Sequence, residues 1–338
     1  SGLPMDLPAM EGDALYFPFL ALLLGCLVSR WLVDRVPLPY TVVLLLLGLL
    51  LAGLHHWTNE GLGSISRSVA LWVSIDPPEL LLYVFLPPLC YDSAFATDWF
   101  VFRRLLLSIL TLAFLLVMFN TIVVGLAMTY VVPAGWADGL DPGTALLAGL
   151  LVAVMLSSTD PVAVVALLKD AGAPMEVRTV IEGESLLNDA SAFVIFEVLR
   201  NILNTERETP TVGSALWSCA TLSLGGLLMG VLFGVGTAVL ISFTDDAVTE
   251  ISLAVAGMYL GYYIPQQMEM SGVIAVVIMG LIMSAVGGSY ISPTSLEPKH
   301  RFMEQLGFTA NTVIFVYSGL VAGSFAFQYG SRVDHPHS

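Results

Sequence analysis

The chain has few charged residues for its length. Lys, Arg, Asp and Glu make up 12% of its 338 residues, whereas soluble domains carry about 25%. Hydrophobic residues make up 57% of the chain, and the mean hydropathy is +0.85. This composition excludes a soluble globular protein and predicts an integral membrane protein.

Basic residues are especially scarce. The 12 Lys and Arg stand against 27 Asp and Glu, giving a formal net charge of −15. This balance leaves no basic patch for nucleic acid. Cys26, Cys90 and Cys219 all lie in apolar segments, without the spacing of a disulfide framework or a metal site. We expect no cofactor and no bound metal beyond a transported ion.

Long apolar runs dominate the chain. Ten segments are mostly apolar over about the 20 residues that a membrane-spanning helix needs. They are 15–34, 38–54, 79–96, 103–131, 144–168, 177–203, 212–243, 248–265, 271–287 and 303–327. The sequence predicts an all-α membrane protein with about ten transmembrane helices. The stretch 58–76 is amphipathic and fits either a helix at the membrane interface or a loop.

The distribution of Lys and Arg predicts the orientation, because these residues favour cytoplasmic loops. With the N-terminus outside, eight of them lie on the inner side and four on the outer side. The eight inner residues are Arg30, Arg35, Arg103, Arg104, Lys169, Arg178, Lys299 and Arg301. We therefore expect a multi-pass protein whose N-terminus lies outside.

The predicted span 144–168 is interrupted by the sequence SSTDP at 157–161. Proline lacks an N–H and clashes with the preceding turn, so Pro161 predicts a broken helix. Breaks at membrane depth occur where they line a cavity, and transporters use them as ion sites. The alternative is a simple kink whose backbone groups are satisfied by Ser and Thr hydroxyls. Thr159 and Asp160 beside the proline favour an ion site.

The next span carries a second group of polar residues. Helical spacing places Glu182, Ser185 and Asp189 on one stripe, with Glu184 and Asn188 beside it. Apolar neighbours indicate that Asp189 lies deep in the span, where a carboxylate costs roughly 2.5–3.5 kcal/mol. It could be a buried acid paired with a basic residue, but no Lys or Arg lies in the middle of any predicted span. A functional acid is favoured, with a structural role for Glu184.

Acids, an amide and hydroxyls at membrane depth form an oxygen site for a proton or a small cation. A carboxylate in an apolar span is costly to leave charged and alone, so Asp189 would hold either a proton or a dehydrated monovalent cation. Asn188, Thr159 and Ser185 would add neutral oxygens, and Asp160 a further carboxylate. Mutually exclusive occupancy gives coupled exchange without any covalent step.

Several strings carry a resemblance to a known family. They are FLPPL at 85–89, STDPVAVVALLK at 158–169, IEGESLLND at 181–189, ANTVIF at 310–315 and SGL at 318–320. Their order and spacing over roughly 15–327 resemble the monovalent cation/proton antiporter family, in its electroneutral sodium/proton exchanger branch. Within the branch, the strings are most similar to plant Salt-Overly-Sensitive and sperm-type exchangers.

The resemblance implies a fold of two inverted repeats, each with one broken helix, and the two broken helices cross at the ion site. By motif, Asp189 would bind the cation or proton, and Asn188 marks the electroneutral branch. Thr159 and Asp160 would belong to the first broken helix, and Ser185 would be a further ligand. We expect the protein to bind Na⁺ (or K⁺ or Li⁺) and H⁺ and to lie in the lipid bilayer.

The resemblance also implies roles away from the ion. Asp92 would line the inner ion pathway, Glu184 would pair with an arginine in an eleventh span, and Pro161 would support the break. A core domain would move like an elevator against a dimerisation domain in a homodimer, in the plasma membrane.

The expected organisation has four parts, with an acidic segment at 1–14 and dimerisation-side helices of the first repeat at 15–96. Core helices follow at 97–210, and a linker helix with the start of the second repeat occupies 211–330. Family members have twelve or thirteen spans. We therefore expect an incomplete inverted-repeat fold, with the remaining C-terminal core helices and a cytosolic tail absent.

Three alternatives remain. Tyr91-Asp92 resembles half the signature of an intramembrane aspartyl protease, but the partner Gly-x-Gly-Asp string is missing. A cation channel would need paired spans around a polar filter loop, which the sequence does not show. A truncated membrane fragment that does not transport is the third alternative.

Overall fold

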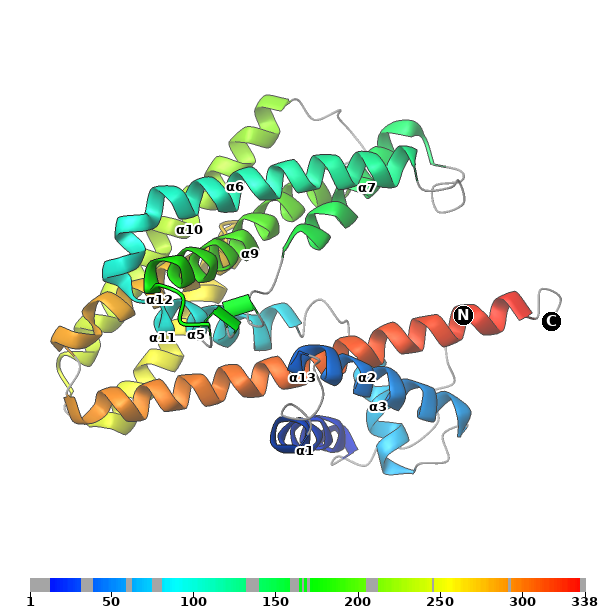
Figure 1. Cartoon of the computed structure of the whole chain (residues 1–338), viewed down its shortest axis with the longest axis horizontal. Helices are drawn as coiled ribbons and strands as arrows, with labels where there is room; N and C mark the ends of the chain where they lie inside the picture. Colours follow the sequence, from blue (N-terminus) through cyan, green and yellow to red (C-terminus); the bar gives the residue numbers. More distant parts are fainter. Residues whose placement is uncertain are drawn as a thin grey trace. The chain divides into compact units, whose positions relative to one another are not determined.

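The computed structural model describes residues 13–31, 39–58, 63–74, 81–131, 140–158, 164–165, 167–168, 171–204, 212–244, 246–290 and 293–334. These residues form helices and a few turns, with no strand among them (Figure 1). The predicted all-α class is confirmed. The chain divides into two compact units, one of residues 1–89 with 304–338 and the other of residues 90–303.

Each of the ten predicted spans contains a helix. The helices are α1 (Tyr16–Trp31), α2 (Tyr40–Trp57), the π-helical turn η2 (Leu81–Phe85) with α5 (Leu86–Ala96), α6 (Trp99–Tyr130), α7 (Pro142–Ser157), α9 (Met175–Asn204), α10 (Val212–Ile241), α11 (Ala247–Gln267), α12 (Gly272–Tyr290) and α13 (Pro293–Asp334). Within the described residues, α2, α6, α10, α11 and α13 are long and apolar enough to cross a membrane by length and composition. Helices α1, α7 and α12 are apolar but shorter, and α9 is long but carries many charged residues.

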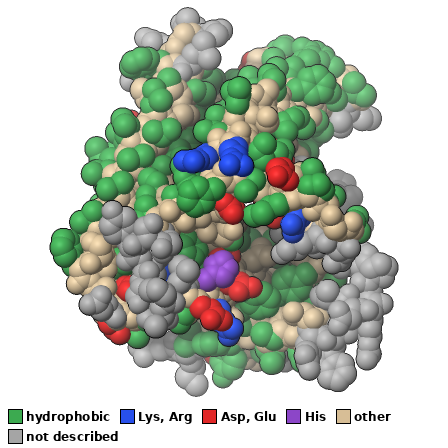
Figure 2. Space-filling model, turned by 60° about the vertical axis from the view of Figure 1, so that its left-hand side comes forward, with side chains coloured by type: hydrophobic (Ala, Val, Ile, Leu, Met, Phe, Trp, Pro, Cys, Tyr) green, Lys and Arg blue, Asp and Glu red, His purple; other side chains and the backbone are tan. Residues whose placement is uncertain are grey.

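The surface of α6 shows the membrane character most directly. Ile109 and Val117 are buried on one side of this helix, while Leu107, Leu115 and Phe119 are exposed on the other. A helix that is apolar all round belongs in a protein core or in lipid. Apolar side chains are also spread over much of the face drawn in Figure 2, around a central group of charged side chains. The exposed side of α6 therefore suits contact with lipid.

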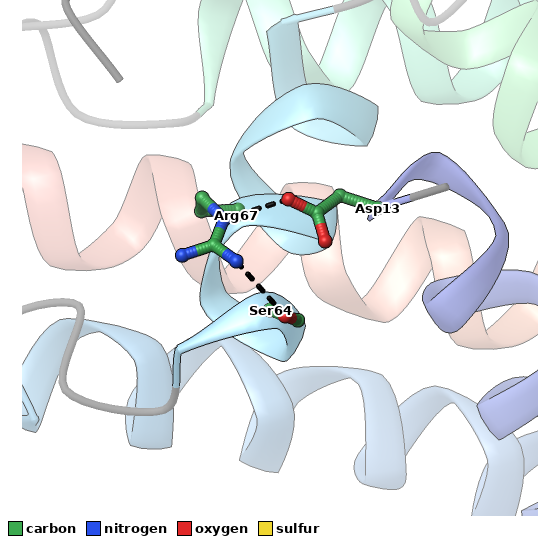
Figure 3. Close-up of polar contacts among 3 residues, drawn as sticks. All are labelled: Asp13, Ser64 and Arg67. Atoms are coloured by element: carbon green, nitrogen blue, oxygen red, sulfur yellow. Dashed lines mark hydrogen bonds and ion pairs between the residues drawn. The ribbon is translucent and has the colours of Figure 1, made fainter. Parts of the chain in front are cut away.

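The amphipathic stretch 58–76 contains a helix, α3 (Ser64–Ser74), so a loop is excluded for these residues. This helix packs against α1, α2 and the short 3-10 turn η1 (Asp13–Leu15). Arg67 Nε donates to the buried Asp13 carboxylate at 2.6 Å, and its Nη2 donates to Ser64 Oγ at 2.9 Å (Figure 3). These polar contacts fix α3 onto the start of the chain. The position of α3 relative to a membrane stays a prediction.

The unit of residues 1–89 and 304–338 is built on a close crossing of α2 with the later part of α13. A Cβ added to Gly48 would lie 2.1 Å from Val316 O, and one added to Gly319 would lie 2.1 Å from Leu45 O. Only glycine allows the two backbones to approach so closely, as is common between helices in membranes. Buried apolar residues surround the crossing, among them Phe17, Leu44, Val69 and Tyr317.

In the unit of residues 90–303, α6 packs against α7 and α9, and α10 packs against α11 and α12. Helix α12 also contacts α6 and α9 and so connects the two groups. The α10–α12 contact is again close, because a Cβ added to Gly230 would lie 2.6 Å from Ala275 O. This arrangement positions α7 beside α9, the two helices that carry the predicted site.

Lys299, one of the residues used to predict the orientation, is buried in this structure. Lys299 lies near the start of α13, which begins at Pro293. The side chain of Lys299 is completely buried. Arg301, two residues further along, is exposed as a loop-facing residue would be. Helix α13 therefore extends further toward the N-terminus than its apolar run, and the placement of Lys299 on the inner side stays a prediction.

Candidate functional site

Helix α7 ends where the sequence predicts the break. Its last residue is Ser157, and Ser158 has an extended backbone, with φ −76° and ψ 124°. The described residues are helical again at 164–165 and 167–168. Thr159, Asp160 and Pro161 themselves lie outside the described residues.

Helix α9 brings the second polar group against this helix end. It packs on α6 through Gly183, where an added Cβ would lie 2.9 Å from atoms of both Ile109 and Phe102. This contact holds α9 along α6, which also packs against α7. Asn188 and Asp189 consequently lie next to the last residues of α7.

Two hydrogen bonds join the helices. Ser158 Oγ donates to Asp189 Oδ1, and Asn188 Nδ2 donates to the backbone carbonyl of Ser157 at 3.1 Å. In a continuous helix the Ser157 carbonyl would accept from the N–H of residue 161, which is a proline and has none. The Asn188 amide supplies the missing donor. The last residue of α7 and the residue that follows it therefore meet two consecutive residues of α9 in one small polar site.

Asn188 is buried, with 2% of its surface exposed. Its amide nitrogen also lies 3.4 Å from Glu184 Oε1, one turn earlier on α9. Its Oδ1 atom is buried and accepts no hydrogen bond from any described residue. Buried polar atoms almost always have a partner. This oxygen is therefore available as a ligand for a donor or a cation.

The Asp189 side chain is exposed at the surface of this structure, and its depth in a membrane stays a prediction. Successive residues on a helix are rotated by about 100°. Asn188 faces the packed side toward α7, so Asp189 turns toward the open side. The apolar neighbours in the sequence showed that α9 is buried, but not which way each side chain points. The exposed carboxylate can be reached by an ion.

The structure places the remaining predicted residues around this pair. Ser185 is buried one turn before Asp189 on the same helix. Asp92 is half-buried on α5. Two residues before Asp92, the buried thiol of Cys90 lies within electrostatic range of Asp189. Helix α5 thus brings part of its length close to the site.

The prediction missed two direct contributors, the Ser158 hydroxyl and the Ser157 carbonyl. The sequence pattern favoured Thr159 and Asp160, which directly precede the proline. A signal for the Ser157 carbonyl was present, since a proline always removes the donor for the carbonyl four residues earlier. That rule, applied to Pro161, indicates Ser157 as the acceptor that needs a partner from another helix.

The chain is similar to known sodium/proton exchangers and antiporters over most of its length. The family model described as "Sodium/hydrogen exchanger, transmembrane" matches residues 19–335. Sodium/hydrogen exchanger 7 of Arabidopsis thaliana is 37% identical over 312 residues, which are 91% of this chain and 26% of that protein. The Na⁺/H⁺ antiporter ApNhaP of Aphanothece halophytica is 31% identical over 288 residues, 83% of this chain and 49% of that protein.

A similar fold is known from a solved structure, the sodium proton antiporter MjNhaP1 from Methanocaldococcus jannaschii. The TM-score is 0.70 at 22% sequence identity, over 91% of this chain and 70% of that one. The chain spans about a quarter to a half of the length of the two curated relatives described above. Since the family model covers almost all of it, the chain is a multi-pass integral membrane protein that belongs to the sodium/hydrogen exchanger family.

Proposed function

We propose that this chain is part of a secondary active transporter that exchanges Na⁺, or Li⁺ or K⁺, for H⁺ across a membrane. The observation that carries the proposal is the junction of α7 and α9. There the Asp189 carboxylate lies beside a broken helix end and a buried amide oxygen that has no donor among the described residues. The matched relatives are named as exchangers and antiporters, which are transporters and not enzymes.

A monovalent cation would bind to oxygens that this junction supplies. Asp189 offers the negative charge, and Asn188 offers its Oδ1 atom. The Ser158 hydroxyl donates to Asp189 in this structure, but a hydroxyl also has two lone pairs and can rotate to offer one to a cation. We propose Ser185, Thr159 and Asp160 as further ligands, in line with the motif.

Competition at one carboxylate would couple the two ions. Asp189 would carry either a proton or the cation, so loading one releases the other. Either occupant brings one positive charge, and the neutral Asn188 adds none. Each exchange would then move no net charge, which is electroneutral exchange. Two residues would support the site. Glu184 accepts a hydrogen bond from the Asn188 amide, and Pro161 would create the break in the helix.

The wider mechanism is proposed from the family resemblance. Residues 97–210 would form the first half of a moving core, and residues 15–96 the dimerisation side of a homodimer. Residues 211–330 would form the linker helix and the start of the second repeat. The core would carry the ion in an elevator movement, with Asp92 on the inner pathway, the N-terminus outside and the plasma membrane as its location.

The test is the Asp189→Asn variant of the full-length protein in proteoliposomes. We expect Na⁺-dependent proton flux to be lost, because the amide can neither bind a proton nor neutralise the cation. Asp141→Asn is the matched control, since Asp141 is an exposed acid at the start of α7 and should leave flux intact. Flux that persists in folded Asp189→Asn protein would refute the proposal.

A further inference from the structure

Two residues of opposite charge, Glu250 and Lys299, lie buried in the unit of residues 90–303. Glu250, in the first turn of α11, is 1% exposed, and Lys299, near the start of α13, is 0% exposed. The two carboxylate oxygens of Glu250 form no hydrogen bond with any described residue. The same is true of the Nζ atom of Lys299. Buried charges carry a large desolvation cost, and removing one partner strands the other. Such a pair therefore calls for an explanation beyond packing.

The Lys299 ammonium lies between two groups that attract a cation. Glu250 attracts it electrostatically. On another side, Nζ lies over the ring of Phe95, 5.7 Å from the centroid. A desolvated ammonium over an aromatic face is attracted by the ring quadrupole. Lys299 thus links α11 to the last turn of α5.

Helix α12 holds the same end of α5. Ser284 Oγ donates to the backbone carbonyl of Thr97 at 2.6 Å. A Cβ added to Gly280 would lie 2.7 Å from Ala94 Cβ, so the two helices approach closely. The Phe95 ring stacks on Tyr91, with centroids 5.8 Å apart. The end of α5 is therefore fixed by a helix contact, a hydrogen bond and a cation over its aromatic pair.

This part of α5 lies next to the exchange site. Asp92 is one turn before Phe95, and Cys90 lies within electrostatic range of Asp189. Asp92, Cys90 and Phe95 share helix α5, so a displacement of α5 at Phe95 would also move Asp92 and Cys90. We propose that Lys299, attracted electrostatically by Glu250, is a positioning residue that sets the place of α5 and of Asp92 relative to Asp189. This inference rests on the exchange function proposed above.

A purely mechanical anchor would not need charge, because well-packed apolar residues often replace buried ion pairs without loss of stability. The decisive variant of the full-length protein is therefore the double change Glu250→Gln with Lys299→Met, which removes both charges and nearly keeps the volume. We expect a Tm close to that of the wild type. The KM for Na⁺ should rise about fivefold to tenfold at unchanged kcat, since the cation over Phe95 is gone.

Two further variants test the link itself. Lys299→Arg keeps a cation that stacks well on aromatic faces, so the KM should stay close to that of the wild type. Phe95→Leu removes the ring but keeps both charges, and should raise the KM like the double change. The matched control is Glu297→Gln with Arg301→Met, an exposed ion pair of 2.7 Å on the same helix, which should have no effect.

An unchanged KM in the folded double variant, or in Phe95→Leu if the double variant does not fold, would overturn the positioning role. A rise in KM in the exposed-pair control would also overturn it, because the effect would then not depend on the buried cation. The proposed exchange function would be refuted by a different result. In that case the wild type would show no more Na⁺-dependent proton flux than the Asp189→Asn variant.

Discussion

The side-chain amide of Asn188 donates a hydrogen bond to the backbone carbonyl of Ser157, 3.1 Å away. The donor lies on one helix and the acceptor is the last residue of another. The bond replaces the N–H that Pro161 cannot offer. It therefore makes the broken helix and α9 parts of one site.

Replacing Asn188 by Leu should destabilise the protein. The Leu side chain has a similar volume but no donor, so the buried Ser157 carbonyl would lose its partner at a cost of about 1–3 kcal/mol. A lower thermal midpoint of the purified full-length protein in detergent would show this. Thr121→Val is the control, because Thr121 Oγ1 lies 3.5 Å from Ser157 Oγ and contributes little. An equal fall in both variants would contradict the role given to Asn188.

Replacing Ser158 by Ala should weaken cation binding. The change removes the hydroxyl that contacts Asp189 and that we propose as a cation ligand. Loss of one such interaction should raise the KM for Na⁺ about threefold to tenfold. Na⁺-dependent proton flux in proteoliposomes measures it. Ser158→Thr retains a hydroxyl and should restore most of the affinity, and a KM unaffected by Ser158→Ala would remove Ser158 from the site.

The start of α11 should contribute stability that depends on pH. Asp246 accepts hydrogen bonds from the Thr249 hydroxyl at 2.8 Å and the Thr249 N–H at 3.0 Å. These bonds hold the pKa of Asp246 below its usual value of 3.8, the hydroxyl having the larger effect. Since the folded-state pKa is the lower one, the stabilisation is complete above pH 3.8 and is lost as the pH falls through the folded-state pKa.

The Asp246→Ala variant checks this directly. At neutral pH its thermal midpoint should lie below that of the wild type, and the difference should shrink under acid conditions. Asp141, which accepts from Thr144 in the same way at the start of α7, should behave alike when replaced by Ala. A difference that is constant from pH 7 to about pH 3 would contradict the argument.

The crossing of α2 and α13 should not tolerate even one added methyl group. Gly48→Ala would place a Cβ 2.1 Å from a backbone carbonyl. The helices would have to separate, at a cost of about 1–3 kcal/mol or more. Gly53→Ala lies on the same helix and meets only the Phe327 ring at 3.4 Å. We expect a clear fall in the thermal midpoint for the first variant and almost none for the second.

The positions of the ten helices could be predicted from the sequence because long apolar runs directly reflect the thickness of a bilayer. The break near Pro161 could be predicted because proline cannot donate a hydrogen bond. The direction of Asp189 could not, since it depends on which side of α9 packs against α7. The sequence also did not predict that Glu250 and Lys299 lie buried together. They are 49 positions apart in the chain, and their proximity depends on how the helices pack. The division at 1–14, 15–96, 97–210 and 211–330 stays a prediction.

The Asn188–Ser157 bond also bears on how the protein is made. Helix α7 is synthesised before α9. The Ser157 carbonyl therefore lacks the Asn188 donor until residue 188 has been added to the chain. An unpaired carbonyl is costly in hydrocarbon. The last turn of α7 must therefore stay at the wet edge of the insertion machinery, or borrow a temporary donor, until α9 arrives. We therefore expect a delay in the insertion of this protein at the junction of α7 and α9.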